Sequence, residues 1–340
     1  MRALMFEGIR DLHFREVDEP RLEADGDALV RPLVVSTCDL DVSIIHEPGA
    51  FAPPFPLGHE FVARVEATGD AVRGFHPGDV VSVAYQPSCG ACAMCARGTS
   101  SACRSVAAIS KTSTYGLGPG AGCWGGALSD LVRVPWADYM LQRLPEGVDA
   151  LRAAGASDNL GDAWRSVAPG LERYPGASVG ITANGALGLI AADIARRLGA
   201  GPVDVYSQRR AVLERAEALG VGAHEIERWP ARLPAHTITV EVTAQPTALL
   251  ALIAGTEPGG ICTSTGALPA TELPLFPMYM RGITLEISRT NGAADHAANL
   301  DRIARGLIDP FAAGHRLVDW NDAPAALVEE PLRLWIQRDG

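Results

Sequence analysis

The sequence predicts an α/β protein with two domains, a mainly-β domain and a domain with a doubly wound parallel sheet. Three observations predict this class. The first 150 residues alternate short apolar runs with glycine and proline turns, which is typical of antiparallel strands. From about residue 176, apolar strands alternate with helical periods, which is typical of βαβ units. A chain of 340 residues is also long enough to form two hydrophobic cores.

Each element follows from a local run of residues. In the first part, apolar runs predict strands at 28–35, 61–67, 80–84 and 128–134. In the second part, we expect strands at 177–182, 203–206, 237–242 and 260–264, and helices over 189–198 and 209–219. After about residue 285 the βαβ pattern ends, so the tail is expected to return to the first domain. The expected boundaries are residues 1–155 for the mainly-β domain, 156–286 for the parallel-sheet domain and 287–340 for the return segment.

Composition limits the classes of partner. A hydrophobic content of 47% and a charged content of 20% are those of an ordinary globular protein. The net charge of -11 and the pI near 5.2 argue against nucleic acid or an anionic membrane as the main partner, because both require a basic surface. The N-terminus, MRALMFEGIR, lacks the apolar run of a signal peptide. We therefore expect a cytoplasmic protein that acts on a small molecule.

Four of the seven cysteines fall within fifteen residues. They are Cys89, Cys92, Cys95 and Cys103, in a Cys-x2-Cys-x2-Cys-x7-Cys spacing. Four thiolates can surround Zn²⁺ tetrahedrally, and the two-residue gaps let one tight loop bring the sulfurs together. The alternatives are disulfides or free buried thiols, and a reducing compartment disfavours disulfides. This cysteine lobe, residues 87–105, is thus predicted to hold a structural zinc with no open coordination position.

A second set of residues carries a family resemblance. The chain contains Cys38-x-x-Asp41, Gly58-His59-Glu60 and Asp158, together with Phe75-x-Pro77-Gly78-Asp79-x-Val81, Gly125-Gly126-Ala127, Leu144-Pro145-Glu146 and a nucleotide-fold motif near 183–188. With the cysteine lobe, these motifs resemble the zinc-dependent medium-chain dehydrogenase/reductase family, the alcohol dehydrogenases. The resemblance covers nearly the whole chain. It implies a GroES-like catalytic domain built from both chain ends and a Rossmann domain between them.

The resemblance also implies a catalytic zinc, the second of two per chain. Its ligands would be Cys38, His59 and Asp158, which leaves a fourth position for water or a substrate oxygen. Asp41 would accept the other ring N–H of His59, and Glu60 would lie behind the ligands or act as an alternate ligand. Zinc held in this way can polarise a carbonyl or lower the pKa of an alcohol. The structural alternative is a small buried cysteine, a core histidine and a helix-capping aspartate.

At three positions the chain departs from the family pattern. Leu40 stands where the family usually has a Ser or Thr that passes the substrate proton toward solvent, and Ser43 stands where a relay histidine is common. Asp162 replaces a usual threonine. The usual hydroxyl relay is therefore missing, and either ordered water, with Glu60, carries the proton or the natural substrate needs none there.

A glycine motif indicates a dinucleotide site. The residues Asn184, Gly185, Ala186, Leu187 and Gly188 follow a predicted strand and open a predicted helix, so backbone can approach a pyrophosphate at Gly185 and the helix can pack closely at Gly188. After the second strand the chain has Ser207-Gln208-Arg209-Arg210, without a carboxylate for the ribose 2′-hydroxyl of NAD. The two arginines can pair with a 2′-phosphate, which favours NADP(H) over NAD(H), unless they only begin a solvated helix.

These inferences predict a zinc-dependent oxidoreductase that transfers hydride between NADP(H) and an alcohol or carbonyl substrate. The family resemblance implies a homodimer or homotetramer. Because Leu40 breaks the usual relay, an alternative on the same fold is reduction of an iminium or conjugated double bond, or epimerisation through transient hydride transfer. A non-enzymatic, cofactor-binding protein is the other alternative, and its mark would be damaged metal ligands.

Overall fold

The computed structural model describes residues 1–340 apart from 48, 50, 108–112, 267, 330 and 339–340. The chain forms two compact units. The first unit comprises Met1–Gly161, Thr290–Arg305 and His315–Gly340, and the second comprises Asp162–Arg289 and Gly306–Gly314. The segment 306–314 of the tail thus belongs to the second unit, although the residues on either side of it belong to the first. In the described part of the chain, no helix is long and apolar enough to cross a bilayer.

The first unit contains a seven-stranded sheet with the order β15-β16-β3-β5-β6-β8, in which β7 also pairs with β3. All neighbouring pairs are antiparallel except β15 and β16. The C-terminal strand β16 pairs with β3, so the two chain ends share one sheet. The strands are β3 (Ala28–Ser36), β5 (Glu60–Thr68), β6 (Val80–Val83), β7 (Val132–Val134), β8 (Leu141–Arg143), β15 (Arg316–Asp319) and β16 (Leu334–Gln337).

A smaller sheet and short helices complete the first unit. The sheet has the order β2-β1-β4, with β1 (Arg2–Gly8), β2 (Asp11–Glu16) and β4 (Phe55–Pro56). Helix α11 (Ala323–Val328) packs beside α1 (Asp39–His46).

The end of α1 at His46 and the start of α11 at Ala323 are 277 residues apart in the sequence. Their packing joins the C-terminal tail to the first unit. The remaining helical segments are α2 (Arg104–Ala107), α3 (Ala137–Met140), α4 (Ala150–Ala153), α10 (Gly292–Ala304) and the 3-10 turns η1 (Cys95–Arg97), η2 (Ser100–Ala102), η3 (Pro119–Ala121) and η4 (Trp320–Asp322).

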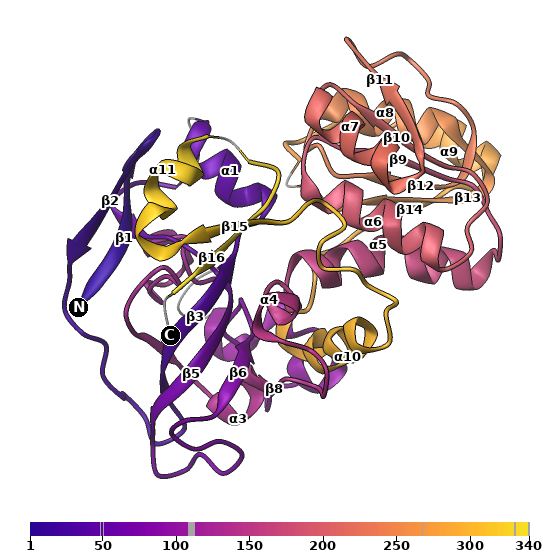
Figure 1. Ribbon diagram of the computed structural model, residues 1–340. Coiled ribbons are helices and arrows are strands. Elements are labelled where there is room, and N and C mark those ends of the chain that lie inside the picture. The colour runs from indigo at the N-terminus through magenta and orange to yellow at the C-terminus, as the bar shows by residue number, and fades with distance from the viewer. Residues whose placement is uncertain (48, 50, 108–112, 267, 330, 339–340) are drawn as a thin grey trace. The chain divides into compact units, whose positions relative to one another are not determined.

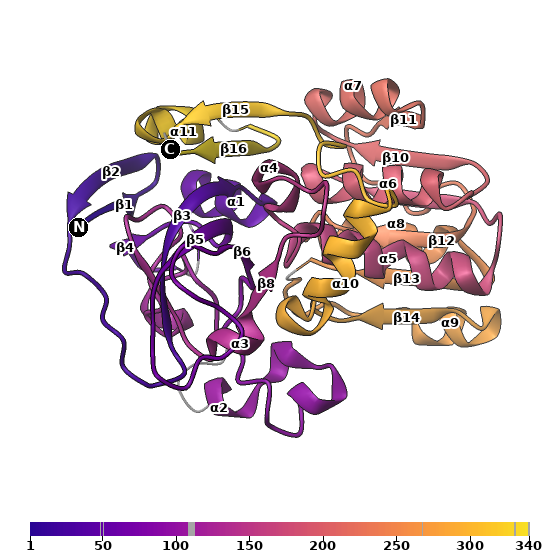
Figure 2. The same ribbon diagram turned by 60° about the horizontal axis from the view of Figure 1, so that its bottom comes forward.

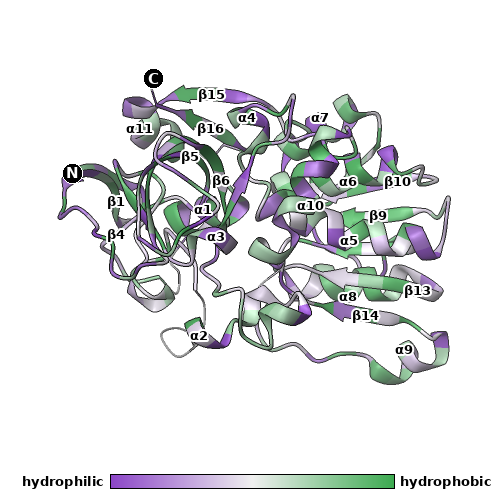
Figure 3. Ribbon diagram, turned by 90° about the horizontal axis from the view of Figure 1, so that it is seen from below, coloured by the Kyte–Doolittle hydropathy of each residue, from purple (hydrophilic) through white to green (hydrophobic). Residues whose placement is uncertain are grey.

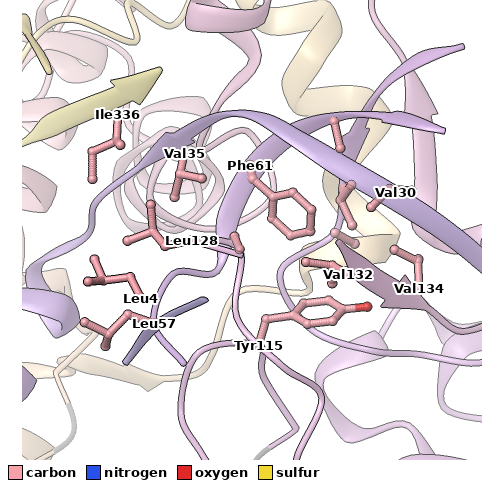
Figure 4. Packing of buried hydrophobic residues seen from close by; sticks show 14 of the residues in the cluster. Leu4, Val30, Val35, Leu57, Phe61, Tyr115, Leu128, Val132, Val134 and Ile336 are labelled. Atoms are coloured by element: carbon pink, nitrogen blue, oxygen red, sulfur yellow. The ribbon is translucent and has the colours of Figure 1, made fainter. Parts of the chain in front are cut away.

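The core of the first unit lies between these sheets. Alternate residues of β3 point inward, and Val30 and Val35 pack with Phe61 of β5 and Ile336 of β16 (Figure 4). Tyr115 meets Phe61 edge-on, with ring centroids 5.8 Å apart. Burial of such apolar side chains contributes about 1.5–3 kcal/mol each. This core fixes the ends of β3 and β5, from which the candidate metal ligands project.

The second unit contains a six-stranded parallel sheet with the order β11-β10-β9-β12-β13-β14 (Figure 2). The order reverses between β9 and β12, which is the switch point of a doubly wound fold, and the carboxyl ends of the strands there form the usual ligand edge. The interior strand β9 is fully buried and largely hydrophobic (Figure 3). The strands are β9 (Val179–Thr182), β10 (Val203–Ser207), β11 (Gly222–Glu225), β12 (His236–Glu241), β13 (Thr256–Ser264) and β14 (Thr284–Ile287).

Helices connect these strands. Helix α6 connects β9 to β10 on one side of the switch point, and α8 connects β12 to β13 on the other side. Because both crossovers are right-handed and run in opposite directions across the sheet, the two helices lie on opposite faces. Helix α7 ends at Gly220, whose positive φ of 76° is the usual C-terminal cap conformation. The helices are α6 (Ala186–Arg197), α7 (Arg210–Leu219), α8 (Pro246–Gly255) and α9 (Leu275–Arg281), and α5 (Asn159–Arg173) begins at the boundary of the two units. The predicted α/β class, a mainly-β unit plus a Rossmann-type sheet, is confirmed.

Candidate functional site

The first group of candidate ligands brings together a thiol, an imidazole and a carboxylate. The ligand atoms of Cys38, His59 and Asp158 lie within 4.8 Å of one another. His59 Nε2 is 3.1 Å from Cys38 Sγ and 3.3 Å from an Asp158 carboxylate oxygen. Cys38 and His59 are buried, whereas Asp158 is partly exposed. All three donors are ones that Zn²⁺ accepts, and three protein ligands leave one position open.

Local sequence positions Cys38 at the start of α1. Cys38 is the N-cap of this helix, and its sulfur accepts a hydrogen bond from the Leu40 backbone N–H at 3.2 Å. The Asp41 carboxylate accepts the Cys38 backbone N–H at 2.9 Å, which completes a capping box. The helix N-terminus favours a thiolate, and so supports a metal ligand there.

His59 is positioned by a glycine. Gly58 has a φ of +92°, and a Cβ at this position would lie 3.1 Å from the backbone nitrogen of Leu128. The chain can therefore turn sharply into β5 only with glycine before His59. On its other side, His59 Nδ1 is 3.4 Å from an Asp41 oxygen, and neither atom has another hydrogen-bond partner among the described residues. With Nε2 directed at the ligand group, Asp41 selects the Nδ1–H tautomer.

The electrostatics of this group favour a cation. Burial raises the pKa of the Cys38 thiol to about 12, and nearby His59 only partly offsets that effect. Burial alone would lower the pKa of His59, but Asp41 and Cys38 raise it well above its ordinary value. The thiol and the two nearby carboxylates thus favour positive charge at this point, either as a protonated His59 or as a bound divalent cation.

The carboxylate of Glu60, predicted to lie behind the ligands or to act as an alternate ligand, is bound by side chains and backbone of this chain. It is fully buried, and one carboxylate oxygen accepts hydrogen bonds from Ser36 Oγ at 2.8 Å and from Arg333 Nη2 at 3.0 Å. The other accepts the Asn159 backbone N–H at 2.7 Å. Burial raises the pKa of Glu60, while the Arg333 guanidinium opposes that shift. Glu60 therefore lies beside the ligand group with its oxygens bound by this chain's own donors.

The second ligand group is the cysteine lobe. The sulfurs of Cys89, Cys92, Cys95 and Cys103 lie within 4.8 Å of one another, and all four are free of disulfides. Backbone N–H groups donate to three of the sulfurs, from Cys89 to Cys103, from Cys92 to Cys89 and from Arg104 to Cys92. Such bonds stabilise thiolates, and backbone donors, first that of Cys95, lower the pKa of Cys92 to about 6. Four converging sulfurs fit a tetrahedral Zn²⁺.

The predicted dinucleotide residues lie at the carboxyl ends of β9 and β10. Gly185 caps α6 and carries no side chain that could cover its amino end. A Cβ at Gly188 would lie 2.3 Å from the Ala183 Cβ, so glycine there allows α6 to pack against the strand. Arg209 donates from Nη1 to the Asn184 carbonyl at 2.7 Å. Ser207 accepts the Arg209 backbone N–H at 3.0 Å.

The other predicted residues of the dinucleotide site are Ala186, Leu187 and Arg210. Ala186 and Leu187 begin α6 and are buried. Arg210 lies on the exposed face of α7, where it pairs with Glu214 at 2.9 Å. Of the two arginines, Arg209 thus lies against the glycine turn, whereas Arg210 makes no hydrogen bond to that turn among the described residues.

Sequence reasoning missed Arg333, Ser36 and Asn159, which surround Glu60. A signal for Arg333 exists, because it is the only charged residue in the otherwise apolar run from Pro331 to Ile336. A charged side chain within a buried apolar run requires a partner. Nothing in the sequence identifies that partner as Glu60, which lies 273 positions away.

Comparisons with known proteins agree with this geometry. Residues 24–146 match the model of the alcohol dehydrogenase GroES-like domain. The chain is 31% identical to an L-threonine 3-dehydrogenase of Streptomyces avermitilis over 291 residues, which are 81% of this chain and 79% of that protein. It is 27% identical to a probable zinc-binding alcohol dehydrogenase of Mycobacterium tuberculosis, over 85% of this chain and 74% of that protein.

The solved structures include a close match in fold. The alcohol dehydrogenase of Thermus sp. ATN1 superposes with a TM-score of 0.88 at 29% identity, and the match covers 100% of both chains. The chain belongs to the zinc-dependent medium-chain alcohol dehydrogenase family.

Proposed function

We propose that this protein is an NADP(H)-dependent and zinc-dependent alcohol dehydrogenase or carbonyl reductase. The observation that carries the proposal is the convergence of Cys38 Sγ, His59 Nε2 and an Asp158 oxygen on one point. In this proposal they hold the catalytic zinc, and the four cysteines of the lobe hold a structural zinc. The protein would act in the cytoplasm as a homodimer or homotetramer.

The residues around the ligand group have separate roles in the proposed reaction. When bound, zinc supplies a Lewis acid that stabilises negative charge on the substrate oxygen, and the nicotinamide supplies or accepts the hydride. Asp41 holds the His59 ring so that Nε2 faces the ligand position. Asp158 and Cys38 supply the anionic donors. Arg333 and Ser36 hold the Glu60 carboxylate in place directly after His59 in the chain, and the Arg333 guanidinium compensates its charge.

The preference for NADP(H) rests on the segment after β10. That strand ends at Ser207 and is followed by Gln208, so no carboxylate stands where one would bind the ribose hydroxyls of NAD. Arg209 supplies a guanidinium close to the glycine turn, and a guanidinium can bind a phosphate through two parallel hydrogen bonds. Arg209→Gln should weaken binding of NADPH by about tenfold or more while leaving NADH binding nearly unchanged. Arg210→Gln, on the exposed face of α7, serves as the matched control.

Turnover tests the proposed chemistry directly. A panel of aldehydes and ketones is offered with NADPH that carries deuterium at the transferable position, and deuterium on the carbinol carbon of the product indicates carbonyl reduction. His59→Ala should abolish this turnover, whereas His46→Ala, at the other end of α1, should retain it because His46 contacts Leu327 O and Arg10 outside the ligand group. Wild-type-like turnover by His59→Ala would refute the proposed role of His59.

One observation favours a second candidate on the same fold. Leu40, next to Cys38, has a side chain without any proton donor and with 38% of its surface exposed. Reduction of an iminium or conjugated double bond, or epimerisation through transient hydride transfer, does not require a hydroxyl relay at that position. Deuterium on a carbon next to nitrogen, or on the carbon of a reduced double bond, would identify this chemistry.

A further inference from the structure

Glu241 is a buried carboxylate at the carboxyl edge of the parallel sheet, outside the metal groups. It is the last residue of β12 and has none of its surface exposed. Within the described part of the chain it makes no ion pair, and its charge is held by uncharged donors alone. A buried carboxylate is costly unless several hydrogen bonds satisfy it. The hydrogen bonds that satisfy Glu241 therefore indicate what this carboxylate stabilises.

Three donors converge on the Glu241 carboxylate, two from the turn after β12 and one from the end of β13. Oε1 accepts the Thr243 backbone N–H at 2.6 Å and the Thr243 hydroxyl at 2.8 Å. Oε2 accepts the hydroxyl of Ser264, the last residue of β13, at 3.0 Å. Glu241 thus joins the turn after β12 to the end of the neighbouring strand.

The two turns approach each other closely at this point. Ala244 has a positive φ of 56°, which is uncommon for a residue with a side chain. A Cβ at Gly266, in the turn after β13, would lie 2.9 Å from the Ala244 Cα and 3.0 Å from Glu241 Oε2. Such a strained and crowded turn persists only where surrounding contacts hold it. The hydrogen bonds of Glu241 are those contacts.

The network extends to the residues that follow β10. The Thr243 hydroxyl accepts the backbone N–H of Gln245, the N-cap residue of α8. Gln245 in turn donates to the Gln208 side chain at 3.1 Å. Gln208 lies in the segment after β10, in which the proposed function assigns the preference for NADP(H) to Arg209. A path of hydrogen bonds thus connects Glu241 with the cofactor-selecting segment.

Glu241 also lies next to the glycine turn. Its strand partner in β9 is Thr182, and the following residue, Val242, donates its backbone N–H to the Thr182 carbonyl at 3.2 Å. A Cβ at Gly188 would lie 3.1 Å from Val242 Cγ2. Among the residues that the structure describes, the buried Thr182 hydroxyl and Asn184 carboxamide oxygen at this edge have no hydrogen-bond partner. Unpartnered buried polar atoms at a ligand edge are available to a bound molecule.

We propose that Glu241 is a positioning residue for the dinucleotide, which fixes the turns after β12 and β13 and, through Thr243 and Gln245, the segment after β10. This inference rests on the proposed dinucleotide binding. Glu241 need not contact the cofactor, because its carboxylate acts by holding the backbone of the edge in one arrangement. Its loss should weaken cofactor binding and leave the chemical step at saturating cofactor unchanged.

The test compares Glu241→Gln with a matched variant of the same strand. Glu241→Gln keeps the shape but places an amide N–H₂ against hydroxyl or N–H donors. The control is Thr239→Val, which removes a buried hydroxyl that bonds Thr256 Oγ1 at 2.7 Å and the Ile261 carbonyl, neither of which lies in these turns. Binding of NADPH is measured by fluorescence titration of the full-length protein, and kcat and the KM for NADPH are measured with the best substrate of the panel. Thr243→Ala provides a milder second variant in case Glu241→Gln does not fold.

The expected result is a rise of about tenfold in the dissociation constant for NADPH in Glu241→Gln, and a smaller rise in Thr243→Ala, with kcat unchanged in both. Thr239→Val should bind NADPH as the wild type does, even where its melting temperature falls. Equal binding by the wild type, Glu241→Gln and Thr243→Ala would overturn the inference, as would an equal loss in Thr239→Val. If the wild type itself binds neither NADPH nor NADH, the proposed function fails instead.

Discussion

Replacement of Arg333 by methionine should destabilise the first unit strongly. The Arg333 and Glu60 side chains have 0% of their surface exposed, and Nη2 of Arg333 is 3.0 Å from the Glu60 carboxylate. The guanidinium fits there because residue 155 is glycine, and a Cβ at that position would lie 2.1 Å from Nη2. Removal of one partner of a buried ion pair leaves an uncompensated charge, at a cost of about 3–5 kcal/mol. We therefore expect a loss of that size for Arg333→Met.

A matched exposed pair provides the control. Arg316 pairs with Glu329 at 2.6 Å in the same C-terminal segment, but these side chains are 48% and 57% exposed. Exposed ion pairs contribute at most about 1 kcal/mol, so Arg316→Met should have little effect. The assay is guanidinium unfolding of each variant, followed by circular dichroism. The double variant Glu60→Gln with Arg333→Met should recover part of the loss, because it removes the unpaired charge. Equal unfolding midpoints for Arg333→Met and Arg316→Met would refute the reasoning.

Three further predictions concern other parts of the fold. Burial lowers the pKa of His296 to about 3, so as the pH falls through about 6.5 this histidine takes up a proton in the unfolded chain but not in the folded one. The free energy of unfolding should therefore fall by about 2 kcal/mol between pH 7.5 and pH 5 on account of His296. Unfolding curves over this pH range should show that His296→Asn lacks this part of the acid sensitivity. Gly188→Val should lower the melting temperature and weaken NADPH binding, because even its Cβ would lie 2.3 Å from the Ala183 Cβ, and calorimetry with and without cofactor checks this. Cys95→Ser should release the metal of the cysteine lobe and lower the melting temperature, since three remaining sulfurs no longer enclose the ion, and retention of that metal would count against the assigned ligand set.

Local sequence predicted most of the second unit. The strands β9, β10 and β12 are short apolar runs, and the glycine turn and α6 follow them in the order that a dinucleotide fold requires. The two edge strands, β11 and β14, were not predicted, because both are short and carry polar or exposed residues. An apolar pattern marks buried strands and is weak at a sheet edge.

Contacts between distant residues explain what the sequence left out. The spacing of the cysteine lobe is local, so its four sulfurs could be grouped from the sequence alone. Cys38, His59 and Asp158 are far apart in the chain, and only the family resemblance grouped them. The pairing of Glu60 with Arg333 has no local pattern, because it depends on β16 returning to the end of β3. The role of Glu241 likewise has no local pattern, because its hydrogen-bond partners include Ser264 of the neighbouring strand.

Metal content tests the central claim most directly. Zinc per chain is measured by elemental analysis of the wild type, His59→Ala and the control His46→Ala, each purified without added metal. The account predicts two zinc ions in the wild type and in His46→Ala, and one in His59→Ala, held by the cysteine lobe. Two zinc ions in His59→Ala, or one in the wild type, would contradict a zinc site at Cys38, His59 and Asp158.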